Sequence, residues 1–267
     1  MSERKINIYS NDTALSRETE KKLCLKLKDA DFKISEKLTD DCELMICIGG
    51  DGAFLEAVHL YEFPEVPIIG INTGHLGFFQ EIYPNDLDTF IESYKKNKYQ
   101  IQELNTVEAF VSLPEGRITL AGLNEIVIKG DNAHSVHLSI SIGEKFIQRS
   151  SGDGILVATP SGSTAYNYSL GGSIVDPRIK LLQVTPIAPM NTTAYRSFTS
   201  SILLPSDLQL AIVPEESHDS TIYIINDGIP HKYNKVNNIE IKFSDKTLKL
   251  LRLENYYFWD KVKTKFL

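Results

Sequence analysis

The sequence predicts two domains of different class: an amino-terminal α/β domain with a doubly wound parallel sheet, and a carboxy-terminal domain built mostly of β-strands. The chain has 267 residues, which is more than one domain usually holds. Its apolar content of 42% is enough for two hydrophobic cores. The hydrophobic periodicity also changes near residue 100, from alternating strands and helices to strands alone.

The first hundred residues alternate short buried strands with amphipathic helices. Apolar runs at 6–9, 44–48 and 68–71 are typical of fully buried strands. A helix is predicted between the last of these strands and residue 98, because its apolar residues have i, i+3, i+4 and i+7 spacing; they are Leu87, Phe90, Ile91 and Tyr94. Alternating strands and helices predict a parallel, open sheet with helices on both faces.

Beyond residue 100 the apolar residues recur with period two. Val136, Leu138 and Ile140 alternate with His137 and Ser139, as in a strand with one buried face. Similar strands are predicted at 123–128, 155–158, 208–213, 221–225, 239–243 and 248–253. The change of composition at 98–105 is polar without being rich in glycine or serine, so we expect a domain boundary there with no flexible linker.

Charge and cysteine usage limit the partners and the compartment. The formal net charge is −7 and the lysines are scattered, so nucleic acid is excluded as a partner. The start of the chain, 1–5, has no apolar signal core, and no run reaches the ~18 apolar residues of a membrane span. Cys24, Cys42 and Cys47 have no metal-binding or redox spacing and indicate buried thiols. We therefore expect a cytoplasmic protein without membrane contact.

A glycine-rich loop, Gly49-Gly50-Asp51-Gly52, lies between the run 44–48 and the helix-like segment 53–58. Glycines let a phosphate approach the backbone, and the following helix start offers free amides and a positive dipole end. Asp51 would repel a phosphate unless a metal ion separates them or the carboxylate takes a proton from an attacking hydroxyl. The loop therefore indicates phosphoryl transfer; the simpler alternative is a turn whose aspartate caps the helix.

The second concentration of small polar residues is in the β-rich half, at 151–154 and 159–167. Its hydroxyl residues follow a predicted strand and could cap a short helix whose amides face a ligand, with Tyr166 offering a flat surface for stacking. The simpler alternative is turn chemistry, since loops rich in serine and glycine are common. Asn124 and Glu125, at a strand start, could supply an amide and a carboxylate to a polar ligand.

Taken together, these motifs resemble those of the NAD kinase family over nearly the whole chain. The segments that carry the resemblance are Gly49–Gly52, Gly70–Phe78, Leu123–Glu125, Gly152–Gly154 and Thr159–Tyr166. The first is shared with phosphofructokinases and diacylglycerol-type lipid kinases. The Asn-Thr-Gly-His-Leu-Gly-Phe and Thr-Pro-Ser-Gly-Ser-Thr-Ala-Tyr segments are similar to NAD kinases in particular.

The resemblance implies a two-domain enzyme with an α/β domain at 1–100, a β-sandwich-like domain at 101–253 and a tail, 254–267, that returns to the first domain. It implies transfer of the γ-phosphate of ATP to the 2′-hydroxyl of the adenosine ribose of NAD, giving NADP and ADP. A divalent cation, normally Mg²⁺, would arrive with ATP, with no dedicated metal ligands from the protein. A homotetramer is also implied, and the aromatic run 256–259 indicates core packing or a subunit contact.

The resemblance also assigns site residues. Asp51 corresponds to the proton acceptor, while Gly50 and Gly52 let the backbone meet phosphates. The positions assigned to the nucleotide-binding sites beyond that loop are Phe78, near the adenine, and Asn124, Glu125, Asp153, Ser161, Thr164, Ala165, Tyr166, Asn167, Ser169 and Ala188. Three positions depart from the pattern: Ala53, Ser151 and Ile229. Relatives often carry a hydroxyl residue or asparagine in place of Ala53. In place of Ser151 some carry arginine, and in place of Ile229 many carry glutamine.

Two other functions are compatible with parts of the pattern. A kinase of the same loop class acting on a sugar phosphate would want converging arginines, whereas Arg149, Arg178 and Arg196 are few and dispersed. A sensor could bind NAD without turnover. Asp51 argues against the sensor, because binding a polyphosphate alone is better served by a neutral or basic residue.

Overall fold

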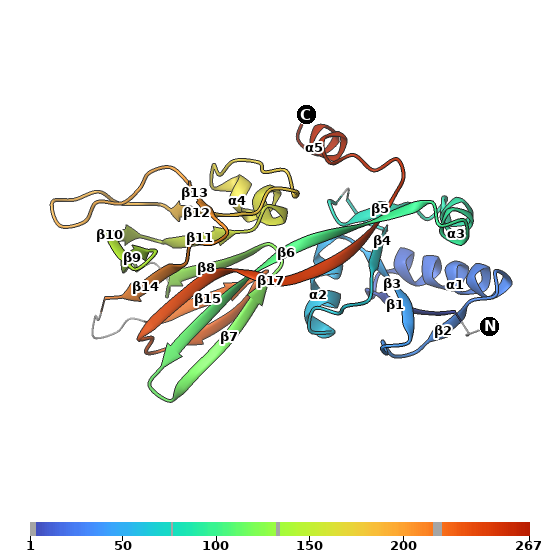
Figure 1. The fold of residues 1–267 in the computed structure, drawn as a ribbon, viewed down its shortest axis with the longest axis horizontal. Coiled ribbons are helices and arrows are strands. Elements are labelled where there is room, and N and C mark those ends of the chain that lie inside the picture. Colours follow the sequence, from blue (N-terminus) through green and yellow to red (C-terminus); the bar gives the residue numbers. More distant parts are fainter. Residues whose placement is uncertain (1–3, 76, 132–133, 216–220) are drawn as a thin grey trace. The chain divides into compact units, whose positions relative to one another are not determined.

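The computed structural model describes residues 4–75, 77–131, 134–215 and 221–267. The chain forms two compact units, one made of Met1–Glu103 with Leu248–Leu267 and the other of Leu104–Thr247 (Figure 1). The described part of the chain contains no helix with the length and apolar character that crossing a membrane requires. Leu76 of the sequence motif 70–78 and the first three residues lie outside the described residues.

The first unit is built on a parallel sheet in the order β17-β4-β3-β1-β2, with β5 paired to β4. Its strands are β1 (Lys5–Ser10), β2 (Lys33–Ser35), β3 (Cys42–Gly49), β4 (Ile68–Asn72), β5 (Gln80–Ile82) and the end of β17 (Asn238–Leu253). Its helices are α1 (Ala14–Asp29), α2 (Asp51–Leu60), α3 (Leu87–Lys95) and α5 (Phe258–Phe266). The predicted α/β class is confirmed.

The sequence of β3 shows why this sheet is covered on both faces. Ile46 and Ile48 point into a core that also contains residues of α1 and α3. Met45 and Cys47 point to the opposite face, yet they are also fully buried. A parallel strand between two layers of helix must be apolar on both faces, which accounts for the continuous hydrophobic run.

Helix α3 buries the face that its spacing predicts. Leu87, Phe90, Ile91 and Tyr94 are all buried, and Leu87 and Phe90 retain only 1% of their exposure. The hydroxyl of Tyr94 donates a 2.8 Å hydrogen bond to Glu43 of β3, which satisfies its polar end. The helix therefore packs against the sheet through the predicted stripe.

The second unit contains two layers of antiparallel strands. One sheet has the order β13-β12-β11-β8-β15-β16, and the other joins β10, β9, β14 and β17, with the hairpin β6-β7 beside β17. The strands, in chain order, are β6 (Tyr99–Leu113), β7 (Gly116–Gly122), β8 (Glu125–Gly130), β9 (Val136–Ile142), β10 (Lys145–Gly152), β11 (Gly154–Ala158), β12 (Leu181–Ile187), β13 (Ile202–Pro205), β14 (Leu210–Pro214), β15 (Ile222–Asn226) and β16 (Ile229–Tyr233). The predicted β-rich domain is confirmed.

A single hydrophobic core joins the two sheets. Ile126 and Ile128 of β8 lie in it together with Leu138 and Ile140 of β9. The alternate residues of β8 and β11 point to the other face of the six-stranded sheet, where Leu170 packs against a smaller cluster. The 3₁₀ turn η1 (Ser161–Thr164) and the short helix α4 (Tyr166–Ser169) precede Leu170. The polar segment that the sequence singles out is thus anchored on a sheet.

The boundaries of the units differ from the sequence-based limits of 100 and 253. The first unit runs to Glu103 and resumes at Leu248. Leu250 pairs with Ile68 of β4, and Leu251 lies in the core with α1 and α3. Strand period predicts a strand at 248–253 but carries no information about its partner, so the sequence does not indicate that this strand pairs with the parallel sheet.

Candidate functional site

The Gly-Gly-Asp-Gly loop forms the predicted strand, turn and helix. Strand β3 ends at Gly49, Gly50 is the N-cap residue, and α2 begins at Asp51. A Cβ atom built on Gly50 or Gly52 would meet no atom within 4 Å. The backbone of this helix start therefore has open space beside it, as binding of an anion requires.

The carboxylate of Asp51 is held by a second loop. The backbone N–H of Phe78 donates to Oδ2 at 2.9 Å, and that of Phe79 donates to Oδ1 at 3.0 Å. A Cβ on Gly77 would lie 2.2 Å from Oδ1, so this close approach requires glycine. Asp51 is thus oriented by a segment far away in sequence, and the simpler reading of a helix-capping aspartate is wrong.

Three cations from the end of β17 and from α5 surround this loop, and sequence reasoning missed all three. Buried Arg252 donates twice to the carbonyl of Phe78, each at 3.2 Å. Lys261 donates to the carbonyls of residues 77 and 80. The Nζ atom of Lys265 lies 3.6 Å from Oδ2 of Asp51. The available signal was the i, i+4 spacing of the two lysines on an amphipathic helix.

Phe78 is only 7% exposed. Its ring centroid lies 5.9 Å from those of Phe258 and Phe266, and Lys265 Nζ lies 4.9 Å from the ring centre. Helix α5 therefore covers much of the ring for which the resemblance implies an adenine contact.

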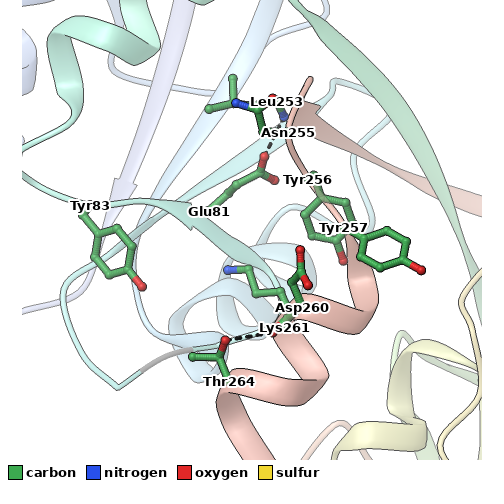
Figure 2. A pocket seen from close by; sticks show the side chains of 9 residues that line it. All are labelled: Glu81, Tyr83, Leu253, Asn255, Tyr256, Tyr257, Asp260, Lys261 and Thr264. Atoms are coloured by element: carbon green, nitrogen blue, oxygen red, sulfur yellow. Dashed lines mark hydrogen bonds between the residues drawn. The ribbon is translucent and has the colours of Figure 1, made fainter.

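A hollow of about 350 Å³ is lined by Glu81, Tyr83 and residues of the carboxy-terminal segment 253–264. Figure 2 shows Glu81, whose carboxylate accepts a 2.6 Å hydrogen bond from the backbone N–H of Leu253, and Lys261 nearby. Burial raises the pKa of Glu81 although Arg252 opposes the shift. The predicted site residues do not line this hollow, so we assign it to the packing of the tail.

In the second unit, Asp227 holds the backbone of the Asn124-Glu125 motif. Its carboxylate accepts hydrogen bonds from the N–H groups of Leu123 at 2.6 Å, Asn124 at 2.7 Å and Glu125 at 3.1 Å. Asp227 and Gly228 form the two-residue turn between β15 and β16, with φ of 48° and 87°. The Asp-Gly pair between two strands is a hairpin signal that can be recognised in the sequence. The contact of this turn with residue 123 cannot be recognised there.

Two polar side-chain atoms of this motif are buried without a protein partner among the described residues. They are Oδ1 of Asn124 and Oε2 of Glu125, in residues that are 5% and 7% exposed. Burying such an atom unpaired costs about 1–3 kcal/mol, so native proteins rarely leave it without a ligand or water. The pair is therefore well suited to bind a polar ligand.

Burial and, to a smaller degree, the nearby charge of Asp227 raise the pKa of Glu125 to about 8. The carboxyl group is then mostly protonated at neutral pH. It can donate as well as accept a hydrogen bond, as a ligand hydroxyl requires.

The raised pKa predicts a pH dependence of stability. An acid whose pKa rises on folding from 4.5 to about 8 stabilises the folded state fully below pH 4.5, and this contribution is lost as pH rises to about 8. Glu125→Gln should therefore remove up to about 1.4 kcal/mol per pH unit from the slope of the unfolding free energy between these limits. Urea unfolding followed by circular dichroism at several pH values measures both slopes; equal slopes would contradict the shift.

The segment after β11 packs directly on the Asn124-Glu125 motif. The backbone N–H of Thr159 donates to the carbonyl of Asn124 at 2.8 Å, and its hydroxyl donates to the carbonyl of Leu123 at 2.6 Å. A Cβ on Gly162 would lie 2.0 Å from the carbonyl oxygen of Asn124. Two predicted motifs are thus joined backbone to backbone, and Ser161 and Thr164 lie in the same turn.

The side chains of Tyr166 and Asn167, both in α4, differ in burial. Tyr166 is 38% exposed, and its carbonyl accepts a 2.7 Å hydrogen bond from the exposed Ser169. Asn167 is fully buried: its amide donates to the carbonyl of Ser163 at 3.3 Å and accepts from the hydroxyl of Thr185 at 2.7 Å. Asn167 therefore holds the segment in place, and Tyr166 and Ser169 are the members that a ligand could reach.

Asp153 and Ala188 lie close together at the ends of two paired strands of the six-stranded sheet, Asp153 just before β11 and Ala188 just after β12. The backbone N–H of Asp153 donates to the carbonyl of Ile187 at 3.0 Å, and both predicted residues are exposed. Ala188 has a φ of 44°, a left-handed conformation that is uncommon outside glycine. A Cβ on Gly152 would lie 2.8 Å from the carbonyl oxygen of Ala188, which explains the glycine there.

The structure thus gathers Gly50, Asp51, Gly52 and Phe78 in one unit, and the motifs 124–125 and 159–169 in the other. No group of three or more potential His, Cys, Asp or Glu metal ligands occurs among the described residues. Cys24, Cys42 and Cys47 are free thiols, and Cys24 is only partly buried, whereas the sequence led us to expect buried thiols.

Two family models match this chain. The ATP-NAD kinase N-terminal domain matches residues 4–99, and the ATP-NAD kinase C-terminal domain matches residues 123–253. Two solved structures share the fold, each at 21% sequence identity. Yeast NADH kinase complexed with NADH has a TM-score of 0.85, and the match covers 99% of this chain and 87% of that one. An NAD kinase from Archaeoglobus fulgidus in complex with ATP has a TM-score of 0.73, and the match covers 98% of this chain and 99% of that one.

Proteins named NAD kinase are also similar in sequence over almost the full length. The protein of Finegoldia magna is 39% identical over 98% of this chain and 97% of its own. That of a Streptococcus agalactiae strain is 35% identical over 98% and 94%, and that of a Staphylococcus aureus strain is 30% identical over 96% and 97%. The order of motifs in the sequence, the two matching domain models and these full-length relatives agree, and the chain belongs to the NAD kinase family.

Proposed function

We propose that this protein is an ATP-dependent NAD kinase that transfers the γ-phosphate of ATP to the 2′-hydroxyl of the adenosine ribose of NAD, giving NADP and ADP. The observation that carries the proposal is the carboxylate of Asp51, which lies at the start of α2 and is oriented by the backbone amides of Phe78 and Phe79. The names of the full-length relatives support the same substrates.

Asp51 is proposed to accept the proton of the 2′-hydroxyl as that oxygen attacks phosphorus. Phosphoryl transfer has a loose transition state, so it needs positioning and charge neutralisation more than covalent help. The two amide donors fix the direction of the carboxylate before substrate binds. Gly50 and Gly52 leave room for phosphate oxygens against the free amides of the helix start.

The second unit is proposed to bind NAD. Asn124 and Glu125 would bind the hydroxyls of the nicotinamide-side ribose through their unpaired buried atoms. A protonated Glu125 suits this role, since it avoids placing another negative charge near the pyrophosphate. The remaining residues proposed for the NAD site are Asp153, Ser161, Thr164, Ala165, Tyr166, Ser169 and Ala188, with Asn167 as a positioning residue. Phe78 is proposed to lie near the adenine.

Mg²⁺ is proposed to enter bound to ATP. It is a hard cation that prefers oxygen ligands and keeps several waters, so the phosphate oxygens of ATP and water can hold it without dedicated ligands from the protein. When bound, the ion would supply charge neutralisation on the phosphate oxygens.

We also propose that the enzyme is cytoplasmic and forms a homotetramer. The three free thiols fit a reducing compartment. Tyr257 and Trp259 are 57% and 40% exposed, and aromatic residues of this kind are enriched at subunit contacts.

The test is the position of the new phosphate. Incubation with NAD, ATP and Mg²⁺ should give NADP phosphorylated on the adenosine ribose, identified by mass spectrometry and phosphorus NMR. NAD that lacks the 2′-hydroxyl should bind but not be phosphorylated. The carboxylate of Asp51 accepts a proton only from a hydroxyl within about 2.6–3.2 Å, and only the 2′-hydroxyl is proposed to lie there. Phosphate on the nicotinamide ribose would contradict the proposal. Tight NAD binding without any product would favour a sensor.

A further inference from the structure

Helix α5 turns one face toward the loop that orients Asp51. Phe258, Lys261 and Lys265 have i, i+3 and i+7 spacing and therefore share that face. Phe258 packs against the ring of Phe78, and Lys261 bonds to carbonyls of the loop. Lys265 continues the same row to the carboxylate of Asp51, with 3.6 Å between Nζ and Oδ2. The helix thus brings an ammonium group directly to the proposed site of phosphoryl transfer.

The three cations near this loop differ in what they bind. The side chain of Arg252 is 3% exposed and its guanidinium is bonded to the carbonyl of Phe78 and to Gln102. Lys261 is bonded to two backbone carbonyls (Figure 2 shows its place in the helix). Lys265 contacts only a carboxylate and an aromatic face among the described residues, and its side chain is 32% exposed. With three N–H donors, its ammonium retains capacity for a ligand.

The distances place a transferred phosphoryl group within reach of Lys265. A hydroxyl that gives its proton to Asp51 must lie about 2.6–3.2 Å from the carboxylate. The phosphorus it attacks is then about 3–3.5 Å from that hydroxyl. Lys265 starts 3.6 Å from the same carboxylate and has a flexible four-carbon stem. A small rotation would carry its ammonium group to the phosphate oxygens.

The stability of the fold does not account for this placement. A partly exposed ion pair between lysine and aspartate contributes little to folding, because solvent screens it. The side chains of Lys265 and Asp51 are 32% and 27% exposed. A cation at this point is, however, of direct use to the reaction, because the carboxylate of Asp51 repels the anionic phosphoryl group that it must meet.

We propose that Lys265 is a catalytic residue that binds the γ-phosphoryl oxygens of ATP during transfer. As the bond from phosphorus to the bridging oxygen of ADP breaks and the bond to the ribose 2′-oxygen forms, the hydroxyl proton passes to Asp51. Lys265 neutralises charge on the oxygens of the group in transit. This inference rests on the proposed role of Asp51.

The test compares Lys265→Met with Lys263→Met. Both remove one positive charge from α5, but Lys263 is an exposed residue that contacts neither Asp51 nor Phe78 in the described structure. With NAD saturating, Lys265→Met should lower kcat/KM for ATP by about 10²-fold, as removal of one donor to a transition-state oxyanion does. Its KM for NAD should change less than about threefold, and Lys263→Met should match the wild type. A loss in both lysine variants, or an equal increase of KM for both substrates, would overturn the proposal.

Two further measurements separate this proposal from a structural role and from the role of Asp51. Lys265→Arg keeps the charge and should recover most of the lost kcat/KM, whereas a packing defect would not be repaired by the larger guanidinium. Calorimetric binding of Mg·ATP needs no turnover: Lys265→Met should weaken it about tenfold or more, by analogy with other lost charged contacts. Unchanged Mg·ATP affinity would overturn the phosphate contact, even if Asp51 proves to be the base.

Discussion

Replacement of Asp51 by asparagine should lower kcat by about 10²–10⁴ while the protein stays folded, because the amide cannot accept the proton of the attacking hydroxyl. The two amides that face the carboxylate, those of Phe78 and Phe79, make a second effect inevitable. The side-chain NH₂ of asparagine must meet one of these N–H donors, and a buried donor left unpaired costs about 1–3 kcal/mol. Urea unfolding should show this loss, and NADP formation should show the loss of turnover.

The control for this variant is Asp88→Asn, which removes one carboxylate from the exposed surface of α3 in the same unit. It should leave kcat unchanged. Turnover near the wild-type value in Asp51→Asn would remove Asp51 from the mechanism. Weaker binding of Mg·ATP together with the loss of turnover would instead assign the carboxylate to the metal ion.

Gly162→Ala should lower the affinity for NAD by about 10²-fold, the effect of displacing a binding group by about 1 Å. The added Cβ would lie 2.0 Å from the carbonyl oxygen of Asn124 and 2.5 Å from its carbonyl carbon. These are backbone atoms, so no rotation of a side chain relieves the overlap. The 159–164 segment or the Asn124-Glu125 motif must move, and either movement separates groups proposed to bind the same ligand.

Calorimetry with NAD alone measures this change without requiring phosphoryl transfer. The melting temperature should fall as well, since overpacking costs about 1–3 kcal/mol. ATP is proposed to bind to the other unit, so its binding should change much less. NAD affinity within threefold of the wild type, in a protein shown to be folded, would contradict the joined arrangement of the two motifs.

Local sequence patterns predicted the features that depend on neighbouring residues. The spacing of Leu87, Phe90 and Ile91 specifies which face of α3 is buried, because the geometry of a helix fixes it. The apolar run before Gly49 and the helix-forming residues after Gly52 likewise specify a strand, a turn and a helix. The strand, turn and helix around the Gly-Gly-Asp-Gly loop could therefore be predicted from a dozen residues.

The contacts that orient the site could not be predicted in this way. Asp227 is 104 positions from Leu123, and Arg252 is 174 positions from Phe78. An aspartate in an Asp-Gly turn or a lysine on a surface helix has the same local signal whether or not it reaches a site. The same limitation applies to residues 248–253, because alternation identifies a strand there but not its pairing with β4.

The division of the first unit into Met1–Glu103 and Leu248–Leu267 has a consequence for biosynthesis. The unit with residues Leu104–Thr247 is continuous and can fold as soon as it leaves the ribosome, whereas β4 has no β17 beside it until residue 250 has been added. Until then the part of β4 around Ile68, which β5 does not pair, has an open apolar edge, and such edges pair readily with other chains. The Gly-Gly-Asp-Gly loop is synthesised early, but the residues of β17 and α5 that contact its surroundings are synthesised last. Nascent chains of this enzyme should therefore need protection from aggregation throughout the synthesis of the β-rich half.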